Sequence, residues 1–208
     1  MDIKPLDFAT DTEEKAVYFI NSYLVDNVDT AETQFYDEYY GIFKYQIDSG
    51  DIKEVWRTTD RLQFLNASSD GKYLAFTQYN TDAYPEYRSE KKVLSISNKA
   101  TELIGLGLQA TWANTQQRFF TGTTNSLYIA GVNRLLPRQP LPSSIRNNVN
   151  STDAYQYAAW SPNDQYIVFN NLSRPTYLYE PSTKEYQTIE GDLRAYHWVT
   201  PQSFLAVK

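Results

Sequence analysis

The feature that most constrains the fold of this chain is a short segment that recurs along its length. Each copy ends one apolar stretch, passes through a polar turn and enters a second short apolar stretch. The clearest copies begin at Ala67, Trp112, Trp160 and Trp198, and a looser copy begins at Phe8. Their starts lie roughly 40 to 60 residues apart, a period typical of tandem arrays of one supersecondary unit.

The segments between the copies complete each unit. Gly41–Ile47 and Ile52–Trp56 are rich in aromatic and β-branched residues, which favour strands. Asp48-Ser49-Gly50-Asp51 between them favours a turn, because Asp and Ser bond their own backbone and Gly accepts a positive φ. No stretch of about 12 residues has apolar positions at helical spacing. The sequence predicts an all-β fold, a β-propeller of four-stranded antiparallel blades with about 4.5 blades present.

We expect a single β-propeller region over residues 1–208. Its blades are predicted at about 3–58, 61–106, 108–140 and 155–191, with a partial blade at 193–208. The last unit supplies two strands, and an incomplete blade leaves an open sheet edge. We therefore predict an incomplete ring or fragment, completed by the missing remainder of the propeller or by self-association through the open blade edge.

Two of the copies resemble a known repeat. Trp160-Ser161-Pro162-Asn163-Asp164, followed by Tyr166-Ile167-Val168-Phe169, resembles the core of TolB-like (WD40-like) β-propeller repeats, and Ser69-Asp70-Gly71-Lys72 with Leu74-Ala75-Phe76 is a second match. Similar repeats occur in the propellers of dipeptidyl-peptidase-type and prolyl-oligopeptidase-type proteins. The resemblance implies a propeller and favours a bacterial, extracytoplasmic location, periplasmic or at the cell surface. It leaves the function open, because propellers host many unrelated activities.

Composition excludes several kinds of site. The chain has no cysteine and a single histidine, His197, so thiolate zinc sites, cysteine nucleophiles and multi-histidine metal sites are not expected. There is no G-x-S-x-G motif of a serine hydrolase. Asp26, Asp29 and Glu32 share a segment but lack the glycine-containing spacing of a calcium loop. We predict no catalytic constellation, no cofactor and no metal.

Charge and hydropathy restrict the partners. The net charge is −6, which opposes binding to nucleic acid. No apolar run approaches the roughly 20 residues of a membrane helix, so no membrane insertion is expected. A protein partner fits these limits best.

Three long connections are predicted to share one face of the propeller. If the four strands of a blade are lettered a to d, their alternating direction places the b–c connections and the d–a connections between blades on the same rim. They span Asn21–Tyr39, Gln78–Glu90 and Pro137–Asp153. Long loops on a rigid scaffold commonly carry binding residues. The candidate binding residues are Tyr36, Tyr39, Tyr79, Tyr84, Tyr87, Arg138 and Arg146. The alternative is that these are solvated loops whose tyrosines pack on their own blades.

The resulting hypothesis is a non-enzymatic binding or scaffold module, which acts in protein–protein interaction or ligand sensing through the long-loop face. One alternative is the substrate-gating propeller of a serine peptidase that lacks its catalytic domain here. That alternative predicts a G-x-S-x-G domain in the parent protein. Another is a carbohydrate-binding propeller, which predicts that several tryptophans or tyrosines are exposed at equivalent blade positions.

Overall fold

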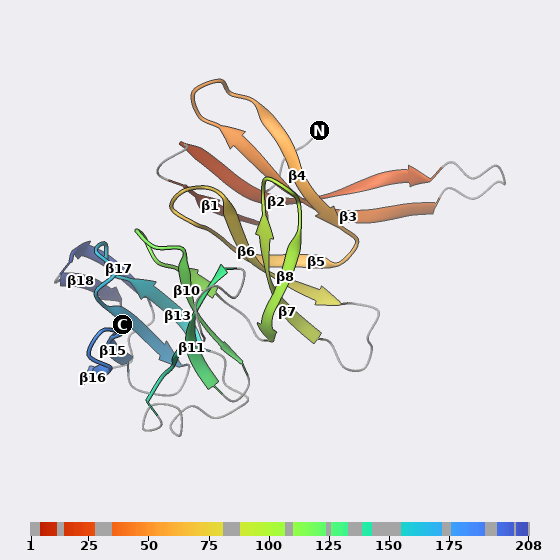
Figure 1. Ribbon diagram of the computed structural model, residues 1–208. Helices are drawn as coiled ribbons and strands as arrows, with labels where there is room; N and C mark the ends of the chain where they lie inside the picture. Colours follow the sequence, from red (N-terminus) through yellow and green to blue (C-terminus); the bar gives the residue numbers. More distant parts are fainter. Residues whose placement is uncertain are drawn as a thin grey trace. The chain divides into compact units, whose positions relative to one another are not determined.

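The computed structural model describes residues 5–11, 15–27, 35–80, 88–106, 110–123, 126–132, 139–142, 155–171, 176–189, 195–201 and 203–207. Within these ranges the regular structure is β-strand, with no α-helix (Figure 1). The strands form four antiparallel sheets of four strands each and one sheet of two strands. The predicted all-β fold of four-stranded blades is confirmed.

Each four-stranded sheet contains four strands that are consecutive in the sequence. Blade one consists of β1 (Asp7–Thr10), β2 (Ala16–Asn27), β3 (Phe35–Gln46) and β4 (Ile52–Thr58). Blade two consists of β5 (Arg61–Ala67), β6 (Tyr73–Asn80), β7 (Arg88–Ser95) and β8 (Thr101–Leu106). Blade three consists of β9 (Ala110–Trp112), β10 (Arg118–Thr123), β11 (Ser126–Gly131) and β12 (Gln139–Pro140).

The remaining strands form blade four and a half blade. Blade four consists of β13 (Tyr155–Trp160), β14 (Ile167–Asn171), β15 (Thr176–Glu180) and β16 (Glu185–Ile189). The half blade consists of β17 (Ala195–Thr200) and β18 (Ser203–Val207). In all five sheets a strand pairs with the strand that follows it, which is the meander expected of blades.

The chain divides into two compact units, residues 1–101 and 102–208, and each has its own hydrophobic core. In the first unit, side chains from alternate positions of β2 and β3 pack against blade two, because successive side chains of a strand point to opposite faces. Tyr18, Ile20 and Ile42 are fully buried there with Leu62 and Leu74. In the second unit the core joins blades three and four around Phe120, Trp160, Ile167, Phe169, Tyr177 and Tyr179.

The tryptophans that begin the repeats hold consecutive blades together in the second unit. Trp160 Nε1 donates to the carbonyl oxygen of Thr111 at 2.9 Å, and Trp198 Nε1 donates to the carbonyl oxygen of Ala159 at 3.2 Å. Thr111 and Ala159 are the residues directly before Trp112 and Trp160. The same hydrogen bond therefore recurs between equivalent positions, and it gives a physical reason for tryptophan at the start of a repeat.

Two details of the strand assignment differ from the sequence-based prediction. Most of the connection predicted over Asn21–Tyr39 is strand, because β2 continues to Asn27 and β3 begins at Phe35. The connection predicted over Pro137–Asp153 contains the fourth strand of blade three. The strand that pairs with β11 is Gln139–Pro140, and a proline is tolerated there because β12 is an edge strand.

Candidate binding site

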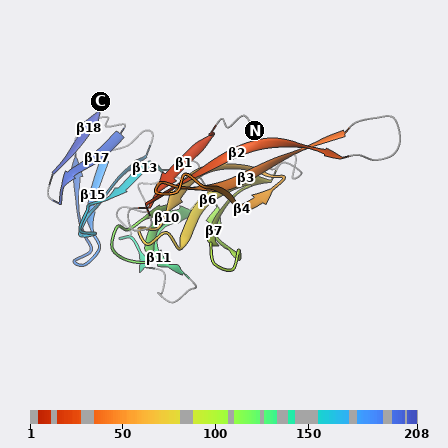
Figure 2. The ribbon, with the colours of Figure 1, turned by 90° about the horizontal axis from the view of Figure 1, so that it is seen from above.

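The site begins with a β-hairpin that is longer than the sheet carrying it. β2 and β3 pair without interruption from Ala16 opposite Gln46 to Asn27 opposite Phe35. β1 pairs with β2 only as far as Ile20, and β4 pairs with β3 only as far as Tyr40. Beyond those points the hairpin is a two-stranded ribbon, residues 23–27 and 35–39, which we call the arm. Figures 1 and 2 show it projecting from blade one in two views.

Aromatic rings line one face of this hairpin, from the sheet into the arm. Directly opposite residues of an antiparallel pair lie on the same face, and Tyr23 is opposite Tyr39 as Phe19 is opposite Phe43. The Tyr23 and Tyr39 rings stack with centroids 6.1 Å apart, and those of Phe19 and Phe43 stack at 5.5 Å. Tyr23 and Phe43 make an edge contact at 6.1 Å. These four rings form the aromatic face.

Gly41 lets the rings of the aromatic face close over the backbone. A Cβ atom at this position would lie 2.6 Å from Phe43 Cε2 and 3.2 Å from Tyr23 Cε1. The first distance is far inside van der Waals contact. Any larger residue at Gly41 would therefore push the rings of Phe43 and Tyr23 away from their present positions.

Charged groups of β4 border the aromatic face. The Tyr23 hydroxyl donates to Glu54 Oε2 at 2.5 Å. The guanidinium of Arg57 lies over the Tyr39 ring, 5.3 Å from its centroid, and Arg57 Nε is 3.9 Å from Glu54 Oε1. Partial burial raises the pKa of Tyr23, and the hydrogen bond to Glu54 raises it further. Tyr39 thus already holds one arginine cation beside a carboxylate.

The opposite face of the arm is apolar and acidic. Leu24 and Glu38 are opposite each other on this face, whereas the next pair, Val25 and Asp37, lies on the same face as Tyr23 and Tyr39. The side chain of Leu24 is 63% exposed, and Asp37 and Glu38 are exposed as well. At the base of the arm, burial and the charge of Glu38 raise the pKa of Tyr40.

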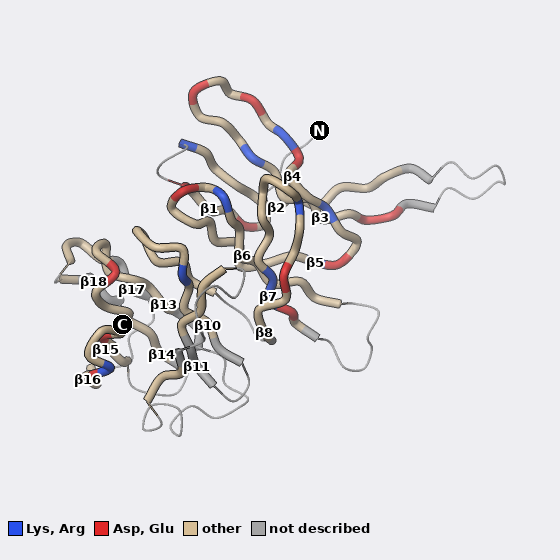
Figure 3. The backbone as a smooth tube through the Cα atoms, in the orientation of Figure 1, with Lys and Arg blue, Asp and Glu red and all other residues tan. Residues whose placement is uncertain are grey.

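The charge of the hairpin has one sign. No Lys, Arg or His lies between Lys15 and Lys44, whereas this segment has acidic residues at Asp26, Asp29, Glu32, Asp37 and Glu38. Figure 3 shows the acidic stretch where β3 enters the arm. The negative field of the chain is therefore concentrated on this hairpin.

The predicted binding residues are distributed unevenly over the described structure. Tyr39 lies on the aromatic face. Tyr36 belongs to the β3 strand of the arm, opposite Asp26, and its side chain lies outside the described part. Tyr84, Tyr87, Arg138 and Arg146 fall outside the described residues altogether. Their assignment stays a prediction.

Tyr79 lies in β6 and faces away from Tyr39. It is opposite Arg61, on the face of β6 that points away from the core shared with blade one, whereas Phe76 points into that core. The face of β3 that carries Tyr39 points away from blade two in turn. Burial raises the pKa of Tyr79. The structure does not bring Tyr39 and Tyr79 onto one surface.

Sequence reasoning missed Tyr23 and Arg57, which contact Tyr39. It also missed Glu54, which accepts from the Tyr23 hydroxyl and pairs with Arg57. A usable signal was present, because aromatic residues stand four positions apart at Phe19 and Tyr23 on one strand and at Tyr39 and Phe43 on the other. Such spacing places each pair on one face of its strand.

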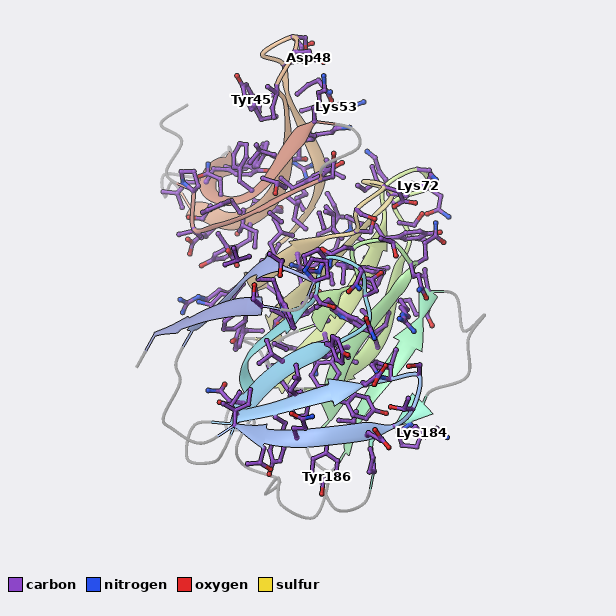
Figure 4. The ribbon with its side chains drawn as sticks, turned by 90° about the vertical axis from the view of Figure 1, so that its left-hand side faces the viewer. Tyr45, Asp48, Lys53, Lys72, Lys184 and Tyr186 are labelled. Atoms are coloured by element: carbon purple, nitrogen blue, oxygen red, sulfur yellow. The ribbon has the colours of Figure 1, made fainter. Side chains whose placement is uncertain are left out.

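A second surface feature lies in the second unit. A groove of roughly 460 Å³ on blade four is lined by Tyr166, Leu178, Glu180, Lys184, Glu185, Tyr186 and Gln187. Figure 4 shows Lys184 and Tyr186 at the β15–β16 hairpin, and it shows Asp48 at the β3–β4 turn of blade one. The outer strand β16 is largely exposed to solvent.

Among the described residues, no group of three His, Asp or Glu side chains is arranged to hold a metal ion. The described part of the chain also contains no helix long and apolar enough to cross a membrane. Asp29 and Glu32 of the acidic segment lie outside the described residues.

No family model matches the sequence, and no curated protein matches it. Among solved structures, the fold is similar to TolB from Acinetobacter baumannii, with a TM-score of 0.57 and 13% identity, covering 89% of this chain and 43% of that chain. It is also similar to a puromycin-hydrolyzing peptidase of Mycobacterium tuberculosis, with a TM-score of 0.62 and 13% identity, covering 93% and 32% of the two chains.

A third similar structure is the β-propeller domain of the Trilobed protease from Pyrococcus furiosus, described as having an open velcro topology. The TM-score is 0.56 at 13% identity, covering 94% of this chain and 59% of that chain. The chain spans less than two thirds of the length of each of these structures. The likenesses confirm the TolB-like propeller fold that the repeat predicted, and at this identity they carry the fold alone.

Proposed function

We propose that this propeller region is a non-enzymatic binding module that presents the arm to a protein partner. The observation that carries the proposal is the extension of β2 and β3 beyond their sheet. A two-stranded ribbon is marginally stable in water by itself, so here the four-stranded blade anchors it. Such a ribbon exposes Leu24 and the aromatic edge of Tyr39 without completing the core.

The chemistry of the arm suits a contact surface. Tyrosine offers a large contact area with few rotatable bonds, so that ordering it in a complex costs little entropy. The stacking of Tyr23 on Tyr39 and the hydrogen bond from Tyr23 to Glu54 fix both rings before any partner arrives. A preorganised surface loses less conformational freedom on binding than a mobile loop does.

The first test uses site-specific photo-cross-linking in the cells that naturally make the protein. A photoreactive residue is placed at Leu24 on the arm and, as the control, at Ile52 at the start of β4, which is 49% exposed on the same blade. We expect a discrete adduct from position 24 and none from position 52. Equal labelling at both positions, or none at position 24, would overturn the proposal.

The second test measures affinity for the partner that the adduct identifies. In an arm-shortened variant, an Asn-Gly turn replaces residues 24–38, because this dipeptide joins two strands tightly. We expect the variant to keep its β-rich circular dichroism and to bind at least about tenfold more weakly, since central contact residues of an interface carry most of its affinity. Unchanged affinity would show that the partner contacts another surface.

The alternative of a substrate-gating propeller is supported by the peptidases among the similar structures. It requires a catalytic domain elsewhere in the same parent polypeptide. Sequencing the intact polypeptide from its natural source decides this alternative. A G-x-S-x-G domain in the parent would favour gating, and its absence would exclude it.

The carbohydrate-binding alternative has less support. Stacking of sugars requires exposed rings, yet Trp112 and Trp160 are each only 4% exposed, and Trp160 and Trp198 use their indole nitrogens between blades. The tryptophans at the repeat positions are therefore part of the scaffold.

The half blade offers a second proposed contact. Within the described residues β18 pairs with β17 alone, and an unpaired strand edge is a template for a further strand. We propose that this edge pairs with the remainder of a propeller or with another copy of the chain. Light scattering on a size-exclusion column tests self-association, and a monomer at all concentrations would exclude pairing between copies.

A further inference from the structure

The turn between the first two strands of a blade gives a common frame for comparing blades. In blades one, two and four a backbone amide donates across this turn to a carbonyl five residues later, at 3.2, 2.9 and 2.8 Å, from Asp11 to Ala16, from Ser68 to Tyr73 and from Ser161 to Tyr166. In this frame Thr10, and not Phe8, stands at the position of Trp160. The residues three before each donor and three after each acceptor are structural counterparts, namely Phe8 and Phe19, Leu65 and Phe76, and Ala158 and Phe169.

In blades two and four the counterpart on the second strand is covered by an aromatic ring of the preceding blade. Phe76 lies 5.2 Å from Trp56 of blade one, and Phe169 lies 5.0 Å from Phe120 of blade three, measured between ring centroids. Phe76 and Phe169 are 2% and 1% exposed. This face of a blade is therefore the one on which the preceding blade packs.

Blade one carries the same arrangement on the corresponding face. Phe8, Phe19 and Phe43 are opposite one another on β1, β2 and β3, and we call them the outer row. Phe19 stacks on Phe43 with ring centroids 5.5 Å apart, as Phe169 stacks on Tyr177 at 5.4 Å in blade four. The outer row thus has the geometry of a row over which a blade packs.

The β1 end of the outer row is open to solvent. Phe8 is 67% exposed, whereas its counterpart Leu65 is 6% exposed and belongs to the core shared by blades one and two. Exposed apolar surface at a packing position marks an interaction site. At the β4 end, Glu54 accepts from Tyr23 and pairs with Arg57, so a cover over this face would not bury an unpaired carboxylate.

The numbers of strands and blades limit what covers the outer row. In the described part of the chain the half blade has two strands, whereas the row crosses three. Two copies of the chain joined in one ring would have about nine blades, more than the four to eight that propellers typically contain. A ring of eight blades leaves room for about three full blades besides those of this chain.

We propose that the outer row is the packing face for a β-blade that belongs to the same parent polypeptide and lies outside residues 1–208. As Trp56 and Phe120 do at the two junctions described, this blade presents an aromatic ring to the row. The inference rests on the proposed completion of the ring at the half blade and adds the second surface at which the ring closes. It does not depend on the proposed role of the arm.

The absence of cysteine from residues 1–208 allows a direct test by labelling. The single variants Phe8→Cys and Leu24→Cys place a thiol at two positions of similar exposure, 67% and 63%. In the 208-residue chain both thiols should react with a maleimide at similar rates. In the intact protein from the cells that naturally make it, we expect the thiol at position 8 to react at least about tenfold more slowly than that at position 24, because thiol reactivity requires access. Equal rates in the intact protein would overturn the proposal.

Cross-linking identifies what covers the row. A phenylalanine analogue that carries a diazirine is placed at position 8 of the intact protein and activated, and mass spectrometry sequences the cross-linked peptides. Beyond contacts within blade one, we expect a peptide of the same polypeptide from outside residues 1–208, with the strand–turn–strand pattern of the repeats. A peptide from residues 102–208, from a second copy or from another protein, or no peptide beyond blade one, would show that the proposed occupant is wrong.

Stability provides a measurement without labels. Phe8→Ser should leave the urea midpoint of the 208-residue chain unchanged, because the side chain is exposed there. In the intact protein we expect the midpoint to fall by about 0.5 M or more, since a covered apolar contact is lost. Leu24→Ser on the arm is the matched control and should shift neither midpoint. An intact Phe8→Ser protein with an unchanged midpoint would contradict the inference.

Failure of this inference is distinguishable from failure of the proposed function. If position 24 yields a partner adduct while the thiol at position 8 stays reactive in the intact protein, the arm is a binding surface and the outer row is not a closing face. If position 8 is covered as expected while position 24 yields no adduct, the ring closes and the proposed role of the arm fails. Self-association in light scattering concerns the edge of β18 alone.

Discussion

The turns between the first two strands of blade two and of blade four share one backbone arrangement. In the first, the amide of Tyr73 donates to the Ser68 hydroxyl at 3.0 Å. In the second, the amide of Tyr166 donates to the Ser161 hydroxyl at 2.9 Å. In both turns an amide three residues after the serine also donates to the serine carbonyl, at 3.0 and 2.8 Å. The same hydrogen bonds therefore form in two repeats of different sequence.

The two turns differ at the residue with positive φ. Gly71 has a φ of 64° and Asp164 has a φ of 57°, a conformation that costs a glycine almost nothing and an L-residue about 1–2 kcal/mol. Asp164 is buried, and its carboxylate accepts from the amides of Asn114 and Thr115 at 2.5 and 2.7 Å and from the Thr115 hydroxyl at 2.6 Å. At the junction with blade one, Gly71 provides its carbonyl oxygen, which accepts from the Tyr18 hydroxyl at 3.2 Å.

The comparison shows that one turn can join blades in two ways. Blades one and two are joined at this turn by a neutral hydrogen bond, and blades three and four by a buried carboxylate that several donors surround. Hydrogen bonds to a charged group are roughly twice as strong as neutral ones. The strained backbone at Asp164 is therefore offset by the contacts that only a side chain at this position can make.

The largest expected effect is that of Asp164→Ala. It leaves the donors of Asn114 and Thr115 without the carboxylate and keeps the strained φ, so we expect a loss of about 3 kcal/mol in the free energy of unfolding. Urea denaturation followed by tryptophan fluorescence measures it. Asp48→Ala at an exposed turn is the control and should change stability by less than about 0.5 kcal/mol. Equal effects would show that the carboxylate does not join the blades.

Blade two buries a basic side chain, Lys91, whereas blade four buries the acidic side chain of Asp164. Lys91 is 1% exposed, and desolvation lowers its pKa to about 7. The folded state therefore binds fewer protons than the unfolded state between about pH 7 and the ordinary lysine pKa, so stability rises with pH across this window. We expect a gain of about 2 kcal/mol from pH 7 to pH 9. Lys91→Met should remove the gain, and a variant with an unchanged pH dependence would contradict it.

A smaller effect is expected for Gly71→Ala. The added methyl group restricts the left-handed backbone, at a cost of about 1–2 kcal/mol. The same change at Gly50, which has a φ of 74° and open space around it, is the matched control and should have a similar cost. If Gly50→Ala is costly and Gly71→Ala is not, the turn of blade two tolerates a side chain as that of blade four does.

The smallest effect is expected for Tyr18→Phe, which removes the hydroxyl that reaches Gly71 across the first junction. A neutral hydrogen bond is worth about 1 kcal/mol, and the ring remains in the core. Urea denaturation measures the difference. A loss as large as that of Asp164→Ala would remove the distinction between the two junctions.

The sequence was sufficient for the fold because the repeat combines two independent signals. The turn chemistry of Ser161 and Asn163 and the apolar strand that begins at Ile167 both lie within ten residues of Trp160. The arm was not foreseen, because acidic residues such as Asp26 and Asp37 disfavour strand when each segment is judged by itself. The arm is stabilised by pairing between two strands, and the strand propensities of single residues carry no information about such pairing.

The candidate site was predicted only in part for the same reason. Tyr39 could be chosen from composition, but its contact with Arg57 depends on the register of β3 with β4, including the irregularity after Ile42. A shift of one residue would place Arg57 on the opposite face. Registers of this kind follow from the packing of the whole blade, and no short segment encodes them.

The tryptophan hydrogen bond between blades has a consequence for the history of such chains. Trp160 and Trp198 each donate to the carbonyl of the residue before the preceding repeat position, so blades three and four each offer the following unit an equivalent acceptor. A blade that is duplicated as a whole carries both the tryptophan donor and the carbonyl acceptor of this hydrogen bond. Nearest-neighbour joints of this type let an array gain or lose repeats without redesign, and propellers can therefore change their blade number by duplication of a single unit.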